Sequence, residues 1–300
     1  MKYRILVAFL IFYGLFPQSS LAEIVGALMP PKVPYYMLIQ DSLEKELKSL
    51  SFGDRVILQR PAPNEMAWKN ATRKLVTLGA RVIVAYGSET AIAIRSENSQ
   101  VPVVFCGAYD PVECGVSGNV TGMDATLPLQ GLVDNLKKIS NFNSLGVMYS
   151  ANEIESVRQL EAVEGLVAKK GGSVKRIDMS DSDSYDLSGI EALLITSAAK
   201  INSQEYIEKI VSSARSGKVA TASVFSGTCE LGVLISMAAD PDIQGKGAAK
   251  MVVQIMKGTN PADIPADTKP KMEMTINLKE AKNLGMSIPF ELLGTAKMVR

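Results

Sequence analysis

The chain has 300 residues, of which 32 are basic and 31 acidic, and it contains no histidine. The missing histidine excludes Ser-His-Asp and Cys-His catalytic arrangements within this chain, as well as zinc sites that use histidine. A net charge of +1 gives no basic excess that would attract nucleic acid or anionic lipid. Any catalytic mechanism would therefore have to rely on Asp, Glu, Lys or Tyr side chains or on a cofactor.

The N-terminus has the pattern of a secretory signal peptide. Lys2 and Arg4 precede an apolar run from Ile5 to Phe16, and Ser20 and Ala22 place small residues before a cleavage point. The run is too short to cross a hydrocarbon layer of about 30 Å. We expect cleavage after Ala22, which removes residues 1–22 and leaves a soluble, exported (periplasmic) protein. An uncleaved N-terminal anchor is the alternative.

The first part of the mature chain predicts alternating strands and helices. Apolar runs predict strands over 23–28, 55–58, 82–85 and 101–105, and helical patterns lie between them at 35–50, 64–78 and 90–97. In the second of these helices, Met66, Leu75 and Leu78 are expected to face inward. Such alternation favours a parallel sheet with helices on both faces.

A second cycle of strands and helices follows residue 122. Strands are expected at 144–149, 174–177, 192–196 and 219–223, and helices at 128–138, 155–169 and 204–215. The last third predicts a strand at 232–237, a helix from 240 to 257, a strand at 272–276, and short helices at 278–284 and 290–298. We infer two lobes connected by crossovers. The first comprises residues 23–122 plus about 238–266, and the second 123–237 plus about 267–300.

Two polar segments follow neighbouring strands of the first lobe, where open α/β sheets bind ligands. The first holds Tyr86, Gly87, Ser88, Glu89 and Thr90, and the second holds Tyr109 and Asp110. Residues 87–90 begin a helix, whose free N–H groups favour an anion such as a carboxylate. The alternative is an ordinary helix N-cap by Ser88. Tyr109 could stack on a ring and Asp110 could pair with a cation, or Asp110 could simply turn the chain.

Other strand ends offer further candidates for a ligand site. Tyr35 and Tyr36 follow the loop after the first strand, where one could pack in the core and the other could cover a ligand. The second lobe contributes Tyr149, Ser150, Glu153, Ser197 and Ser223. The alternative for Glu153 is a favourable charge at a helix N-terminus.

The three cysteines allow two interpretations. Cys106 and Cys114 lie on either side of the loop over 107–113, and export would permit a disulfide between them. The alternative is that all three cysteines, including Cys229, are small apolar residues of the core.

An ordered set of short stretches carries a resemblance that spans nearly the whole mature chain. The stretches are Gly87–Ala91, Val101–Phe105, Tyr109–Pro111, Gly118–Gly122, Gln244-Gly245, Ala248-Ala249, Ile255–Pro261, Ile276–Leu278, Ala281, Leu284-Gly285 and Ile288-Pro289. In this order and spacing the chain resembles the substrate-binding proteins of ABC importers with a type I periplasmic-binding fold. The branch of tryptophan- and tyrosine-type receptors is the most similar.

The resemblance implies a two-lobed, monomeric receptor that closes about a hinge, is not an enzyme, and needs neither a cofactor nor a metal ion. It would deliver a small organic ligand, such as an amino acid or an aromatic carboxylate, to an ABC permease. A periplasmic receptor for a membrane signalling partner is the alternative, and an α/β enzyme is a remote one.

The chain also departs from that branch at two strand ends. Receptors for aromatic amino acids tend to carry Asp-Asn after the strand equivalent to 192–196, where this chain has Ser197-Ala198-Ala199. Their acidic cluster after the next strand is replaced by residues 224–227, Val-Phe-Ser-Gly. Because an α-amino group needs a carboxylate or carbonyl partner, the ligand is either an amino acid held differently or a molecule without an ammonium group.

Overall fold

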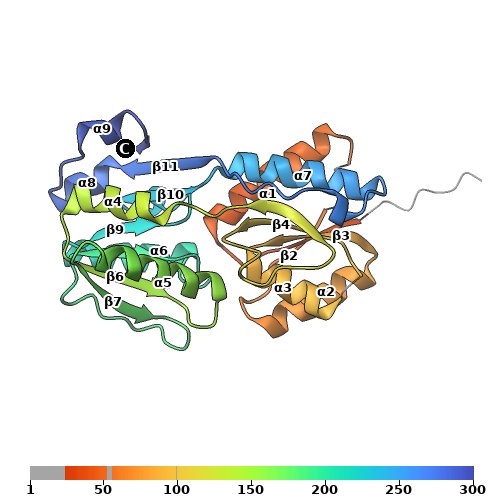
Figure 1. Ribbon diagram of the computed structural model, residues 1–300, viewed down its shortest axis with the longest axis horizontal. Coiled ribbons are helices and arrows are strands. Elements are labelled where there is room, and N and C mark those ends of the chain that lie inside the picture. Colours follow the sequence, from red (N-terminus) through yellow and green to blue (C-terminus); the bar gives the residue numbers. More distant parts are fainter. Residues whose placement is uncertain (1–23, 53–55, 99) are drawn as a thin grey trace, which may run out of the picture.

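Two α/β lobes lie side by side along the longest axis of the computed structural model, which describes residues 24–52, 56–98 and 100–300 (Figure 1). The first lobe contains a five-stranded sheet in the order β2-β1-β3-β4-β5, and the second a seven-stranded sheet in the order β12-β11-β10-β9-β8-β6-β7. The signal peptide expected at residues 1–22 lies outside the described residues.

The first lobe is a fully parallel sheet between two pairs of helices. Its strands are β1 (Ile24–Leu28), β2 (Val56–Gln59), β3 (Ala80–Tyr86), β4 (Val103–Ala108) and β5 (Val120–Asp124), and its helices are α1 (Pro34–Ser49), α2 (Glu65–Thr77), α3 (Ser88–Glu97) and α7 (Pro241–Met256). Helices α1 and α7 cover one face, and α2 and α3 cover the other (Figure 1). Strands β1 and β4 are buried along their whole length, as expected for apolar strands covered on both faces.

The second lobe repeats the arrangement with a mixed sheet. Its strands are β6 (Ser144–Tyr149), β7 (Ser173–Asp178), β8 (Ala192–Ile195), β9 (Ala220–Ser223), β10 (Ile235–Ala239), β11 (Met272–Asn277) and β12 (Lys297–Val299). Its helices are α4 (Leu129–Ser140), α5 (Ile154–Ala168), α6 (Gln204–Ser216), α8 (Leu278–Leu284) and α9 (Phe290–Leu293), with a short 3-10 helix at Cys229–Leu231. A second 3-10 helix, Pro261–Asp263, lies on the first-lobe side. Strand β11 is antiparallel to β10, which corrects the expectation of a purely parallel sheet. The chain reaches β11 from the first lobe, so no crossover helix within the second lobe sets its direction.

The two α/β halves predicted from the sequence are confirmed, but two short strands were not predicted. Strand β5 contains Gly122, where a Cβ would lie 2.2 Å from the Phe105 carbonyl oxygen, so the strand depends on a close approach rather than on apolar side chains. The helix expected at 290–298 ends at Leu293, and Lys297–Val299 forms β12 instead.

The buried stripe of α2 differs from the one predicted. Met66 and Leu78 are exposed, so their predicted inward positions are wrong, whereas Leu75 is buried as expected. The stripe instead runs through Trp68, Ala71, Thr72 and Leu75, which are the buried residues of the helix. Their spacing of three and four residues defines one face of a helix.

The chain passes between the lobes after β5, after β10 and before β11, and backbone hydrogen bonds join these crossover segments. The N–H of Asp124 donates to the carbonyl of Asp267 at 2.9 Å, and the N–H of Asp267 donates to Gly122 at 2.9 Å. The N–H of Asp240 donates to the backbone carbonyl of Lys271 at 2.8 Å. Across residues 24–52, 56–98 and 100–300, no helix combines the length and apolar character needed to cross a membrane.

Candidate functional site

The lobes meet where strand ends of the first sheet face the start of α5 in the second lobe. Helix α3 begins at Ser88, and its N-cap is Gly87, with a φ of 83° and no side-chain cap. A Cβ at Gly87 would lie 2.8 Å from the Tyr36 hydroxyl, so both the backbone angle and the packing favour glycine. Ser88 is therefore not the N-cap, and the backbone N–H groups at the start of α3 are available to an acceptor.

A carboxyl group of the second lobe occupies this helix N-terminus. Oε1 of Glu155, in the first turn of α5, accepts hydrogen bonds from the N–H of Ser88 at 2.7 Å and from the N–H of Tyr109 at 2.9 Å. The Glu155 side chain is 1% exposed. Thus the two polar segments of the first lobe converge, as we expected from the sequence, but on a group from the same chain.

A carboxyl group of the first lobe likewise binds the start of α5 in the second lobe. Oε1 of Glu89, in the first turn of α3, accepts a hydrogen bond at 3.1 Å from the N–H of Glu155. Each helix N-terminus is thus capped by a carboxyl group from the opposite lobe, which is a favourable use of two helix dipoles. The neighbouring Thr90 hydroxyl donates to the Tyr86 carbonyl at 2.7 Å and therefore stabilises the start of its own helix rather than a contact between the lobes.

Glu89, Glu153 and Glu155 form a carboxyl cluster at the lobe boundary. Burial raises the pKa of the Glu89 carboxyl. Burial, and next the charge of Glu89, raise the pKa of Glu155 and raise the pKa of Glu153 to about 8. A carboxylate oxygen of Glu153 also accepts a hydrogen bond from the N–H of Ala199 at 2.8 Å, which favours the charged form. The cluster therefore holds protons more tightly than exposed carboxyls do.

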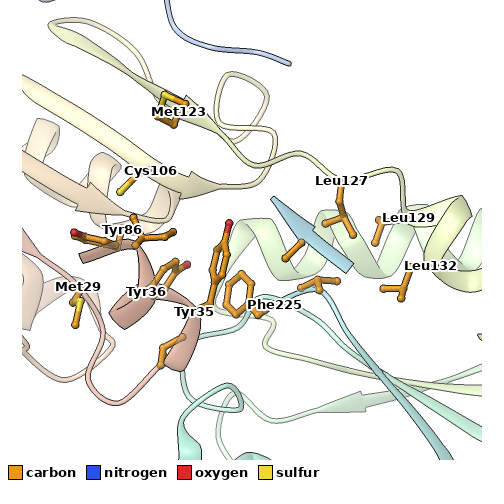
Figure 2. Close-up of a cluster of buried hydrophobic side chains, with 14 of the residues drawn as sticks. Met29, Tyr35, Tyr36, Tyr86, Cys106, Met123, Leu127, Leu129, Leu132 and Phe225 are labelled. Carbon is orange, nitrogen blue, oxygen red and sulfur yellow. The ribbon is translucent and has the colours of Figure 1, made fainter. Parts of the chain in front are cut away.

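Three tyrosines proposed from the sequence lie in an aromatic contact between the lobes (Figure 2). The Tyr35 ring stacks on Phe225 of the second lobe, with centroids 4.7 Å apart, and Tyr36 lies 5.2 Å from the same ring. Tyr86 meets Tyr36 edge to face at 5.8 Å, and its hydroxyl donates to Gln40. All three tyrosines are buried, so both Tyr35 and Tyr36 pack in the core.

An ion pair adds to the boundary contacts. Nη2 of Arg158, one turn along α5 from Glu155, lies 2.5 Å from Oδ2 of Asp110. Asp110 has a φ of 50°, a backbone conformation that aspartate tolerates better than most residues. Asp110 therefore both turns the chain and pairs with a cation, and the cation comes from the second lobe.

A cavity of about 390 Å³ lies beside these contacts and is shared by the lobes. It is lined by Pro63, Asn64, Glu65 and Trp68 from the first lobe and by Ser150, Asn152, Glu153, Ser180 and Lys200 from the second. Trp68 is 5% exposed, and its Nε1 has no hydrogen-bond partner among the described residues. A buried N–H without an acceptor is costly, so the indole nitrogen of Trp68 is an unsatisfied donor close to the cavity wall.

The remaining candidates of the second lobe divide into two kinds. Ser150 lines the cavity, and Ser197 is buried with a hydroxyl that has no partner among the described residues. The Ser223 hydroxyl accepts a hydrogen bond from the N–H of Phe225 at 3.1 Å and so shapes a local turn. Tyr149 is half-buried, and the charges that act on its hydroxyl belong to the second-lobe residues Asp178, Arg176 and Glu164. The structure therefore does not group Tyr149 or Ser223 with the cavity.

Sequence reasoning missed Glu155 and Trp68. A glutamate in the first turn of a helix is an ordinary complement to the helix dipole, so Glu155 carries no distinctive local pattern. Trp68 is the single tryptophan of the chain, and this rarity is the sequence feature that could have marked it as a candidate site residue.

The structure leaves all three cysteines free and buried. Burial raises the pKa of the Cys114 and Cys229 thiols to about 12 and also raises the pKa of Cys106. The disulfide considered between Cys106 and Cys114 is not formed here, and the cysteines behave as small apolar residues. Among the described residues, no group of three or more His, Cys, Asp or Glu side chains could hold a metal ion.

Comparisons with known proteins agree on the kind of protein this chain resembles. The family model of ABC transporter substrate binding proteins matches residues 41–300. A tyrosine-binding protein of Clostridioides difficile is 23% identical over 258 residues, covering 80% of this chain and 74% of the relative.

Solved structures show the same fold. An ABC domain of Streptococcus pneumoniae in complex with L-Trp superposes with a TM-score of 0.84 at 24% identity, covering 93% of this chain and 99% of that chain. A substrate-binding protein with adhesive properties from Clostridium difficile, in its ligand-free, open form, gives a TM-score of 0.66 at 19% identity, with the same two coverages. A leucine-binding protein of Thermotoga maritima gives 0.63 at 14% identity, covering 89% of this chain and 97% of that chain.

Proposed function

The chain belongs to the family of ABC transporter substrate-binding proteins, and on this basis we propose that its two lobes close over a small organic ligand in the cavity they share. Members of this family bind small molecules and work with ABC permeases. One observation carries the proposal: Glu155 of the second lobe bonds to the backbone of Ser88 and Tyr109 in the first lobe, beside a cavity that both lobes line.

The ligand we propose is an amino acid or a related amine with a flat or aromatic part. The relatives named above include a tyrosine-binding protein and a complex with L-Trp. The cavity supports the same class because it combines the Trp68 indole with the carboxyls of Glu65 and Glu153. A carboxylate is a strong partner for an ammonium group, and an ammonium group beside Glu153 would favour loss of the proton that its raised pKa otherwise retains. Glu153 would thus replace the aspartate that this chain lacks after β8.

Closure would work by differential affinity. A ligand that contacts both lobes binds the closed form more tightly, so it shifts the open–closed equilibrium, and the permease responds to the closed surface. Moving that equilibrium from 1:99 to 99:1 requires about 5.5 kcal/mol. Two charge-assisted hydrogen bonds of about 1.5–3 kcal/mol each and a stacked ring are of this order. The higher TM-score with the L-Trp complex than with the open, ligand-free protein supports a closed arrangement here.

Several finer features belong to this proposal. The protein is exported after removal of residues 1–22, acts as a monomer, and performs no reaction on its ligand. Its lobes comprise residues 23–122 with about 238–266, and 123–237 with about 267–300. Delivery to a permease follows from the family, whereas no observation favours a signalling partner.

Titration calorimetry of the purified mature protein against the common amino acids and their amines tests the proposal. Small-angle scattering with each binder should report a smaller radius of gyration, because the ligand favours the closed form. If no member of the panel binds and none compacts the protein, the proposed function fails.

A further inference from the structure

We propose that Glu155 fills the position where a ligand carboxylate would bind, so that the natural ligand carries an amine but no free carboxylate. This inference rests on the proposed function and specifies the ligand class of the same site. It assigns Glu155 as the residue that sets this specificity.

The first step is that the anion site at the start of α3 is already satisfied. The N–H groups of Ser88 and Tyr109, which point to a single acceptor, both donate to Oε1 of Glu155. A ligand carboxylate could use these donors only by displacing the Glu155 carboxyl. That carboxyl would then be buried without its donors, which is unfavourable.

The second step is that Glu155 is held in place from both sides. Its own N–H donates to Glu89 of the first lobe at 3.1 Å, and Arg158 in the next turn of α5 pairs with Asp110. Displacing Glu155 from the α3 N-terminus would therefore disturb the contacts that keep the start of α5 against the first lobe.

The third step is that the adjacent cavity favours a cation. Its lining includes the carboxyl of Glu153 and that of Glu65, which already pairs with Lys69 at 2.5 Å. Lys200 is the cationic side chain among the lining residues described, and its Nζ lies 2.6 Å from Oδ1 of Asp183. A ligand ammonium group would favour the charged form of Glu153 and pair with it, whereas a ligand carboxylate would find an ammonium group that already has a partner.

An independent observation points to a ligand in this cavity. Trp68 is nearly fully buried and lines the cavity, and its indole N–H has no acceptor among the described residues. The nitrogen itself is enclosed, so a ligand hydroxyl would accept this hydrogen bond after a small shift of the cavity wall, while the amine pairs with Glu153. The ligand class that satisfies both groups is an arylalkylamine with a hydroxyl acceptor.

Three probes that differ only in their charged groups test the inference: tyramine, tyrosine and 3-(4-hydroxyphenyl)propionate. Calorimetry with the mature protein should show tyramine binding at least tenfold more tightly than tyrosine, and no measurable binding of the propionate. In Glu155→Ala the donors of Ser88 and Tyr109 become available, so the preference for tyramine over tyrosine should fall at least tenfold. Glu155→Gln, which keeps an acceptor oxygen, should retain the preference for tyramine.

Glu164→Gln is the matched control, because Glu164 lies on the same helix and pairs with Arg176 within the second lobe. It should leave the order of the three probes unchanged, and circular dichroism should show that all variants are folded. Wild-type protein that binds tyrosine as tightly as tyramine, or a Glu155→Ala variant with an unchanged preference, overturns the inference. Compaction by any of these ligands would still leave the proposed function intact, whereas failure of every amino acid and amine to bind would remove both.

Discussion

The ring of Tyr35 stacks on the ring of Phe225 across the lobe boundary, with centroids 4.7 Å apart and planes at 20° (Figure 2). Tyr35 lies in the first turn of α1, and Phe225 follows β9 of the other lobe. Both rings are buried. Because the two residues belong to different lobes, this contact stabilises the observed arrangement of the two lobes without a ligand.

Phe225→Ala should therefore open the ligand-free protein. Truncating a buried phenylalanine costs about 3–5 kcal/mol in a fixed core, and opening of the lobes relieves part of that cost. We expect a larger radius of gyration in small-angle scattering and a lower melting temperature. Phe290→Ala is the control, because Phe290 is 88% exposed, and it should change neither quantity. An unchanged radius for Phe225→Ala would show that the aromatic contact does not hold the lobes together.

The raised pKa of Glu153, to about 8, predicts a pH dependence with a definite sign. The folded form binds a proton that the unfolded form releases near its ordinary pKa of about 4.3, so the free energy of unfolding should fall as pH rises from about 4.3 to about 8. One proton gives a slope of at most about 1.4 kcal/mol per pH unit. Urea unfolding at several pH values measures it. The groups that face Glu153 include Glu89 and the Ala199 N–H, and Glu153→Gln should flatten the curve. Stability that increases over this range in the wild type would contradict the assignment.

The ion pair between Arg158 and Asp110 should contribute little to stability. Both side chains are about one-third exposed, and such pairs are worth about 0.2–1 kcal/mol. A double-mutant cycle with Arg158→Met and Asp110→Asn should give a coupling free energy in that range. The same cycle on Arg176 and Glu164 is the control, because this pair lies on the outside of the second lobe and does not connect the two lobes. A coupling free energy well above about 1 kcal/mol would show that the pair holds the two lobes together more strongly than an exposed ion pair can.

Gly245 in α7 should tolerate no side chain, because a Cβ there would lie 2.5 Å from the Ile39 carbonyl oxygen of α1. Gly245→Ala should force the two helices apart and destabilise the protein by about 1–3 kcal/mol, as measured by thermal unfolding. Gly165→Ala in α5 is the matched control, since a Cβ there would meet no atom within 4 Å apart from the adjacent backbone of its own helix. It should be neutral or stabilising by up to about 1 kcal/mol. Equal effects of the two substitutions would mean that α1 and α7 are not closely packed.

Trp68→Phe should weaken ligand binding about fivefold to tenfold, because it removes the indole N–H while keeping an aromatic wall. Calorimetry with the best binder of the amino-acid and amine panel measures the change. Met66→Leu on the same helix is the control, because Met66 is exposed. Unchanged affinity in Trp68→Phe would place the ligand away from the indole nitrogen.

The sequence by itself determined the local elements of this protein. Continuous apolar runs such as Val82–Ala85 predicted the buried parallel strands, and helical spacing between them predicted the helices that cover the sheets. Strands β5 and β12 escaped prediction because they depend on pairing with neighbours rather than on an apolar pattern.

Only the tertiary structure decided how the polar strand ends are used. The hydroxyls of Thr90 and Ser223 make hydrogen bonds within their own turns. Tyr35 and Tyr36 are buried in the core. Glu155 binds a helix N-terminus 67 residues away in the sequence. The physical reason is that a hydrogen bond between lobes depends on how two separately folded sheets are placed against each other. Local periodicity and capping preferences act over a few residues and carry no information about that placement.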